Sequence, residues 1–207
     1  MRVIAPAGGP ATDVRSRSSL DVTIEPAIPD NTAFTVLRTL RELGYQELQA
    51  VSRADHLLLT VRHAGGSGAE GPAAQRVAQQ LSKAEVLFNP NKHRLAYAPA
   101  AASSTDGAPD YEALVFEKDD DAGRLLAVLR TTFGMGYLES VARGVVWRLR
   151  ERDRAAPAER LHWACQTLLS NRVSQDYEVR VRPERIILGA DGKSVGEQND
   201  GAAKELR

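Results

Sequence analysis

A ten-residue segment that occurs twice constrains the fold of this chain more than any other feature of its sequence. Val36–Tyr45 returns as Val128–Tyr137, and six of the ten positions are identical. The match continues beyond the segment at three further pairs of residues, Leu48 with Leu138, Val51 with Val141, and Arg53 with Arg143. Such self-similarity indicates two copies of one small structural unit. The fold is therefore predicted one copy at a time.

The first half of the chain alternates between strand-like and helix-like patterns. Residues 21–25 alternate apolar and polar side chains, as a half-buried strand does, and Pro26 ends the pattern. Asp30 or Asn31 can cap a helix, whose apolar positions follow helical spacing until Gly44. The remaining elements are apolar segments over 48–51 and 56–61, a helix that opens at Pro72 and a short strand over 94–97. The two apolar segments form either a hairpin or one strand with an irregular start.

The second half repeats this order. Residues 113–116 form an apolar strand, and an apolar helical stripe runs from Leu125 to Phe133. Residues 145–149 then alternate as a strand. The remaining elements are a helix that opens at Pro157 and ends near Asn171, a strand over 177–181 and a short edge piece over 186–188.

Both halves therefore predict the order strand, helix, strand, helix, strand. Helices with one apolar face must cover one face of a sheet, which gives an α+β fold of two-layer sandwiches. A unit of roughly 75 residues buries a small share of its surface, so we expect the two tandem β-α-β-α-β units to pair as an intrachain pseudo-dimer. The predicted organisation is a disordered segment at 1–19, a first unit at 20–98, a linker at 99–110, a second unit at 111–183 and a mostly flexible tail at 184–207.

Composition and charge exclude several classes of function. Among 207 residues, 27 are basic and 27 are acidic, whereas a nucleic-acid-binding protein normally carries a basic excess. Aromatic residues make up only 5%, too few for base-stacking platforms, so we expect no nucleic-acid partner. No apolar run approaches the ~20 residues that cross a bilayer, and Met1–Leu20 lacks the apolar core of a secretory signal. With one cysteine, the chain suits a reducing compartment, and we predict a cytoplasmic protein without membrane contact.

Groups able to carry out chemistry are few and scattered. The four histidines, His56, His63, His93 and His162, show no metal-ligand spacing, and ordinary surface or edge positions are expected for the first two. Cys165 lies on the apolar stripe of a helix, where a buried thiol behaves as a small hydrophobe. We therefore predict no catalytic residue, no metal site and no cofactor, and we assign no cofactor-binding residue.

Other segments allow two interpretations. Asp119–Asp121 can be read as a Mg²⁺ site, but adjacent carboxylates at a helix start more often interact with the helix dipole. Gly65–Gly68 is predicted to be a flexible linker, with a loop that closes on a partner as the alternative. Gly134–Gly136 resembles a phosphate loop but follows a helix, so we predict a helix end and turn. The basic groups are Lys92–Arg94 and the alternating Arg148, Arg150 and Arg152, the latter either a solvated face or a docking surface for an acidic partner.

The end of the second half resembles a known family. Its residues follow the pattern Leu-Leu-x-Asn-Pro-x-x-x-x-Tyr-x-Val at Leu168, Leu169, Asn171, Tyr177 and Val179, with Arg172 in place of the proline. This pattern is similar to the close of the small subunit of bacterial phosphoribosylformylglycinamidine synthase. The front of each half also follows the family's order, at Val22–Pro29, Leu43–Tyr45, Val51–Arg53 and Leu57–Val61, and again at Gly136–Tyr137, Val141–Gly144 and Val145–Leu149. The first half keeps Asn89-Pro90 but lacks the Tyr-x-Val ending.

The resemblance implies a role in purine biosynthesis. The enzyme of this family converts formylglycinamide ribonucleotide to its amidine with ATP and glutamine-derived ammonia, and its small subunit joins the glutaminase to the ATP-dependent synthetase without being the catalyst. The expected partners are therefore the glutaminase and synthetase subunits of the same complex, and the pseudo-dimer can associate further with itself. A family member usually carries one unit and dimerises, whereas this chain carries two diverged units.

A second class of function stays open. Paired α+β units of this size also suit regulatory domains, whose small-molecule ligands sit between two sheets. A glycine-containing turn after the first strand would favour this class, because a ligand could then reach backbone groups. The turns here are Pro26–Pro29 and Glu117–Asp119, which contain no glycine. The sequence therefore favours the assembly subunit.

Overall fold

The computed structural model describes residues 15–64, 70–99, 110–118, 121–152, 154–188 and 194–195. The first half contains β1 (Arg15–Pro26), α1 (Asn31–Glu42), β2 (Leu48–Ala64), α2 (Glu70–Leu81) and β3 (His93–Pro99). The second half contains β4 (Tyr111–Glu117), α3 (Ala122–Thr131), β5 (Leu138–Glu151), β6 (Arg154–Ala155), α4 (Ala158–Ala164), the π-helical turn η1 (Cys165–Leu169) and β7 (Gln175–Val181). Two short strands follow, β8 (Ile186–Leu188) and β9 (Ser194–Val195).

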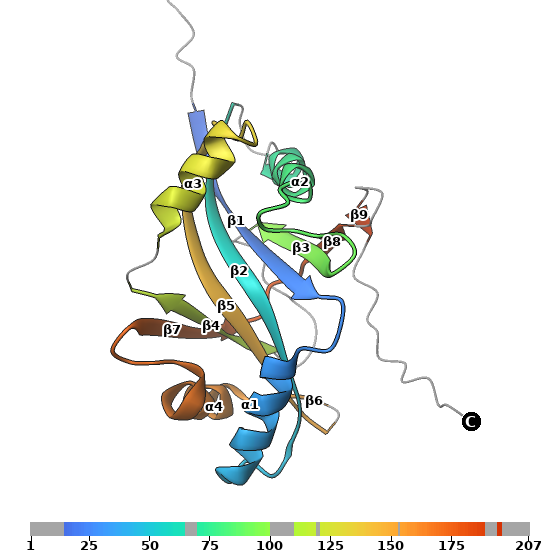
Figure 1. The fold of residues 1–207 in the computed structure, drawn as a ribbon, viewed down its shortest axis with the longest axis vertical. Coiled ribbons are helices and arrows are strands. Elements are labelled where there is room, and N and C mark those ends of the chain that lie inside the picture. Colours follow the sequence, from blue (N-terminus) through green and yellow to red (C-terminus); the bar gives the residue numbers. More distant parts are fainter. Residues whose placement is uncertain are drawn as a thin grey trace, which may run out of the picture.

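An antiparallel sheet unites both halves of the chain. Its strands lie in the order β7-β4-β5-β2-β1-β3-β8-β9, and β6 pairs with the end of β5. Figure 1 shows the long strands β1, β2 and β5 running side by side, with α2 and α3 towards one end of them and α1 and α4 towards the other. The predicted α+β class is therefore confirmed, because the described residues form four α-helices packed on an antiparallel sheet.

The strands at the centre of the sheet are long and unbroken. β2 is one strand from Leu48 to Ala64, so the alternative of a hairpin over 48–61 is excluded. It pairs with β5 along nearly its whole length, and register shifts near both ends mark local irregularities. Asp55 lies opposite Val145 near the middle of this pairing.

The two helices of the repeated segment are anchored in the same way. Arg41 Nε donates a hydrogen bond to the backbone oxygen of Leu48 at 2.6 Å. Arg130 Nε donates to the backbone oxygen of Leu138 at 2.8 Å. In each case the last turn of a helix is tied to the first residue of the strand that follows it, so both copies enter their long strand through the same turn.

The glycines in these turns show that the two segments correspond in the structure with a different alignment from the one in the sequence. Gly44 has φ 107° and Gly134 has φ 68°, a region of backbone conformation that favours glycine. The next residue is fully buried in both turns, Tyr45 in one and Met135 in the other. The sequence match pairs Gly44 with Gly136, whereas the structure gives the role of Gly44 to Gly134. The predicted helix end and turn at 134–136 is confirmed.

Two apolar cores lie between the sheet and the helices. The α2–α3 core joins these helices to β1, β2, β3 and the start of β5, and the α1–α4 core joins the other helices to β4, β5 and the start of β2. Each core takes residues from both halves of the chain. Leu40 and Leu48 of the first half are buried in the α1–α4 core, whereas Leu129 and Leu138 of the second half are buried in the α2–α3 core.

The sheet is strongly curled. β7 and β8 stand near opposite ends of the strand order, yet only Arg182–Arg185 connects them. In a flat sheet, a strand spacing of ~4.8 Å would place β7 and β8 about 29 Å apart. The connection spans at most about 18 Å, so the two ends of the sheet must approach each other. Figure 1 shows β4 and β7 crossing β2 and β5 at a steep angle.

Both ends of the sheet extend beyond the predicted units. β1 begins at Arg15, so the prediction of disorder is wrong for residues 15–19, which pair with β2. In the predicted tail, Arg185 is buried and β8 pairs with β3, so 185–188 is part of the fold. Most of the predicted linker, residues 100–109, lies outside the described residues.

Candidate functional site

A group of charged side chains is buried on the sheet face opposite the two cores. Alternation along β1 places Leu20 and Val22 in the α2–α3 core and Asp21 on the other face. On β4, Glu112 likewise faces away from the core that contains Ala113. Asp21 and Glu112 are both 0% exposed. Because β5 and β2 separate β4 from β1 in the sheet, only its curl brings these carboxylates to common partners.

Arg185 joins the two carboxylates. Its Nη2 donates to Asp21 Oδ1 at 3.0 Å and to Glu112 Oε1 at 2.7 Å, and its side chain is 1% exposed. Arg180 on β7 also donates to both carboxylates, and Arg148 on β5 donates to Glu112 at 3.3 Å. We call Asp21, Glu112, Arg148, Arg180 and Arg185 the charge cluster.

His56 on β2 extends the charge cluster. Its Nε2 lies 2.9 Å from Asp21 Oδ2, and the residue is 1% exposed. The ring also contacts Phe116 edge-on, with centroids 5.8 Å apart. The predicted surface or edge position of His56 is therefore wrong, because the curl of the sheet covers this face.

Hydrogen bonds and nearby charges from His56 and the arginines keep both carboxylates ionised. Burial alone raises the pKa of Asp21, but the hydrogen bond from His56 and the charges of His56, Arg185 and Arg180 outweigh it and hold that pKa well below its usual range. Burial also acts to raise the pKa of Glu112, and hydrogen bonds and charges from Arg185, Arg148 and Arg180 lower it to about 2. At neutral pH the charge cluster therefore contains two carboxylates and three guanidinium groups.

The charge cluster is suited to holding the fold and not to acid–base chemistry. Its carboxylates are buried and already accept hydrogen bonds from several arginine nitrogens. In the part of the chain that the structure describes, no group of three or more His, Cys, Asp or Glu residues could hold a metal ion. The cluster instead ties β1, β4 and β7 to the connection that leads into β8.

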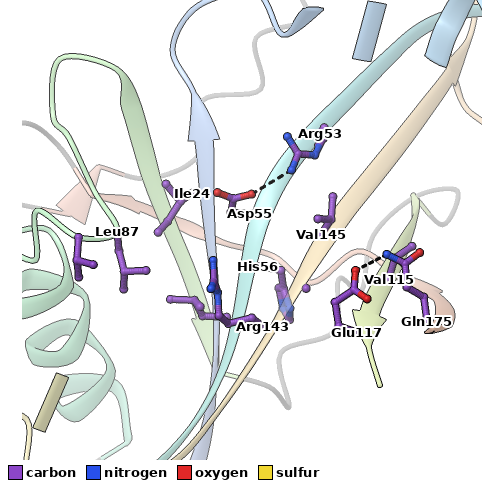
Figure 2. A pocket seen from close by; sticks show the side chains of 13 residues that line it. Ile24, Arg53, Asp55, His56, Leu87, Val115, Glu117, Arg143, Val145 and Gln175 are labelled. Atoms are coloured by element: carbon purple, nitrogen blue, oxygen red, sulfur yellow. Dashed lines mark hydrogen bonds and ion pairs between the residues drawn. The ribbon is translucent and has the colours of Figure 1, made fainter. Parts of the chain in front are cut away.

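A cleft opens on the other face of the sheet, between the two cores. Its floor is apolar and comes from adjacent strands, with Ile24 on β1, Leu57 on β2, Val115 on β4 and Val145 on β5. The volume is about 310 Å³. Figure 2 shows charged and polar side chains around this floor. We call this the central cleft, because it surrounds the pairing of Asp55 with Val145.

The walls of the central cleft carry both signs of charge. Arg53 Nη2 lies 3.5 Å from Asp55 Oδ1, and Arg53 also reaches Asp30 at 3.8 Å. On the β4 side, Gln175 donates a hydrogen bond to Glu117, as the second dashed line in Figure 2 marks. Arg143 also lines the cleft. An apolar floor with mixed charges suits a small amphipathic or zwitterionic molecule, and the volume is at the lower end for ligand pockets.

The structure places the other predicted residues apart from one another. His63 is half-buried at the end of β2, and His162 is exposed on α4 with its ring against Tyr177. Cys165 is buried as predicted, and burial raises the pKa of its thiol to about 12. His93 is half-buried at the start of β3 and lies against Phe88.

The residues of the predicted charged segments also lie in different environments. Arg148 belongs to the charge cluster, so a solvated position is wrong for it, whereas Arg150 and Arg152 are exposed. Asp121 stands at the start of α3, where its side chain makes no capping hydrogen bond and its carboxylate lies 3.9 Å from Arg124. Asp119, Asp120 and Gly65–Gly68 lie outside the described residues.

Sequence reasoning missed the charge cluster because no local pattern marks it. Asp21 and Glu112 occupy positions where an alternating strand normally carries a solvated residue. The arginines come from β5, β7 and the β7–β8 connection. One signal was available in the sequence. Arg180 lies in the last predicted strand and Arg185 lies shortly after it, and both are opposite in charge to Asp21 and Glu112.

Comparison with protein-family models and with curated proteins found no match. Across the described ranges, no helix has the length and apolar character required to cross a membrane.

Proposed function

We propose that this chain is a non-catalytic assembly subunit of phosphoribosylformylglycinamidine synthase. In this role it bridges the glutaminase and the ATP-dependent synthetase in purine biosynthesis. The resemblance to the small subunit supplies the identity of the complex. The observation that carries the architectural part is the repetition of one strand order in the two halves, β2-β1-β3 and β5-β4-β7.

The pairing of β2 with β5 supports an intrachain pseudo-dimer. Arg53 lies opposite Trp147, and Arg143, its counterpart in the repeat, lies opposite Leu57. Asp55 and Val145 lie opposite each other midway between these two pairs. Two copies of one unit related by a local twofold axis produce this register. In our proposal, the covalent pair replaces the association of two single-unit subunits, and its diverged halves meet different partners.

Exposed apolar side chains near α1 offer a surface for such a partner. Ile28 is 63% exposed and Phe34 is 61% exposed, and both line a hollow of about 340 Å³. Exposed apolar groups that gather in one place favour protein contacts. We therefore assign this surface to one of the two partner subunits.

The proposal is tested by co-purification of the tagged full chain with the glutaminase and synthetase encoded in the same genome. A ternary complex is expected, and a Phe34→Ser variant should lose one partner while the exposed control Val173→Ser keeps both. Deletion of the gene, where no second small subunit is encoded, should create a purine requirement. Growth without purines after that deletion would contradict the assignment.

A paired α+β regulatory domain that binds a small molecule is the second candidate, because the central cleft lies at the junction of the two halves. A thermal-shift screen with amino acids and nucleotides tests it, since a ligand at about 100 times its Kd stabilises the folded state by about 2.7 kcal/mol. The stabilisation should disappear in Arg143→Gln and persist in Arg150→Gln, an exposed control on the same strand. A screen without any stabilising compound would rule against this candidate.

A further inference from the structure

A second cavity lies between the end of β2, the first turns of α2 and the start of β5. Its volume is about 430 Å³. Polar groups on its wall belong to Arg62, His63, Arg76 and Tyr137, and apolar contact surface comes from residues that include Val61 and Val77. This cavity is separate from the central cleft, with which it shares no lining residue.

The cavity has a surplus of positive charge. Arg62 and Arg76 line it, and none of the described residues on its wall carries a carboxylate. Arg62 lies 3.8 Å from Glu139, but Arg17 contacts the same carboxylate at 2.7 Å and shares its charge. Arg76 is exposed on α2. Two arginines thus line one cavity, and among the described residues the carboxylate of Glu139, which Arg17 shares, is the acidic partner of one of them.

His63 adds an unfilled hydrogen-bonding capacity. Both of its ring nitrogens are buried, and neither has a hydrogen-bond partner among the described residues. A buried polar group without a partner is costly, because it has lost its bonds to water. An oxygen atom of a bound molecule would relieve that cost.

In the first half, the corresponding turn contains an acidic residue that pairs with an arginine. Glu47 stands there, as Tyr137 stands in the second half when Gly44 is matched to Gly134. Glu47 lies 3.9 Å from Arg160, whose guanidinium also stacks 4.9 Å from the Tyr45 ring centroid. The turn of the first half therefore carries an acidic residue at the position where the cavity of the second half carries Tyr137.

We propose that this cavity binds the phosphate group of a small phosphate monoester. Arg62 and Arg76 pair with the phosphate oxygens, for which the planar guanidinium has matching geometry. His63 donates a further hydrogen bond, and the apolar wall near Val61 and Val77 contacts the body of the molecule. The inference goes beyond the assembly role and does not depend on it.

The test is isothermal titration of the full chain with phenyl phosphate, inorganic phosphate and phenol at constant ionic strength. Phenyl phosphate should bind saturably, inorganic phosphate more weakly, and phenol not at all. Arg76→Gln should weaken phenyl phosphate by about tenfold or more, since a charge-assisted hydrogen bond is lost. Arg38→Gln, which changes an exposed arginine on α1, should leave the affinity unchanged.

Imidazole resonances give an independent readout. Among the four histidines, His63 should show the largest shift as phenyl phosphate is added to the labelled protein. Absence of saturable binding would overturn the proposal, as would equal weakening by Arg76→Gln and Arg38→Gln. A circular dichroism melt checks that Arg76→Gln is folded, and Arg62→Gln provides a second variant at the same cavity.

Discussion

Arg185 Nη2 donates a hydrogen bond to Asp21 Oδ1 at 3.0 Å, although 164 positions separate the two residues in the chain. Asp21 belongs to β1 near the centre of the sheet, and Arg185 belongs to the connection between β7 and β8. Their contact exists only because the sheet curls. The charge cluster is therefore the point at which the two ends of the sheet are fixed to its middle.

Loss of Arg185 should destabilise the protein strongly. In Arg185→Met, two fully buried carboxylates lose a shared partner, and breaking a buried ion pair from one side costs about 3–5 kcal/mol. Urea denaturation measures the free energy of unfolding. Arg124→Met is the control, because Arg124 pairs with the exposed Asp121 at 3.9 Å, and such pairs contribute about 1 kcal/mol or less. Equal effects of the two changes would contradict the role of the charge cluster.

The charge cluster should also make stability depend on acid pH. The pKa of Glu112 falls from 4.5 to about 2 on folding, and the pKa of Asp21 is lowered as well. Both groups therefore stabilise the folded state above their unfolded pKa values, and this contribution is lost as pH falls from about 5 through the folded values. Unfolding free energies measured across this range should decline steeply. In Glu112→Gln the decline should be shallower, and an unchanged slope would refute the assignment.

Replacement of Gly44 or Gly134 should destabilise the protein more than replacement of Gly136. In Gly44→Ala or Gly134→Ala an added Cβ meets no atom within 4 Å, so the expected loss of about 1 kcal/mol comes from the left-handed backbone alone. Gly136→Ala has the same open space without a positive φ and should be nearly neutral. Chemical denaturation of the three variants decides which glycine of 134–136 is the true counterpart of Gly44.

A methyl group at Gly144 should disturb the pairing of β4 with β5. The added Cβ would lie 2.7 Å from the backbone oxygen of Val115 and 2.8 Å from Cδ1 of Phe116. Because backbone cannot move aside cheaply, Gly144→Ala should cost about 2 kcal/mol or more. Gly123→Ala on α3 meets no atom within 4 Å and should not destabilise the protein. Equal melting temperatures for the two variants would contradict this packing.

Cys165 should be unreactive in the folded protein. The thiol is buried, and burial raises its pKa to about 12, so almost no thiolate is present at pH 8. Iodoacetamide should modify the protein in urea but not in native buffer, as mass spectrometry can follow. Rapid modification of the native protein would mean that the helix stripe around Cys165 is not buried.

Local features of the fold were predictable from the sequence, and long-range ones were not. Asp30 caps α1 and Gly44 ends it, as the local pattern indicates. Whether 48–61 formed one strand or two depended on pairing with β5, which no local pattern contains. The buried position of His56 and the partners of Asp21 depended on the curl of the whole sheet. That curl follows from the short connection between β7 and β8, whose effect appears only once the strand order is known.

The separation between Asp21 and Arg185 also sets when the chain can reach its final form during synthesis. A ribosome adds about 5–20 residues per second. Arg185 is therefore synthesised on the order of 10–30 s after Asp21, from which 164 positions separate it. During that time, of the partners described above, Asp21 can have only His56, which lies 35 positions along the chain. Contacts of such long range also slow folding. The nascent first half therefore lacks the arginine contacts of the charge cluster until β7 and the β7–β8 connection have been made.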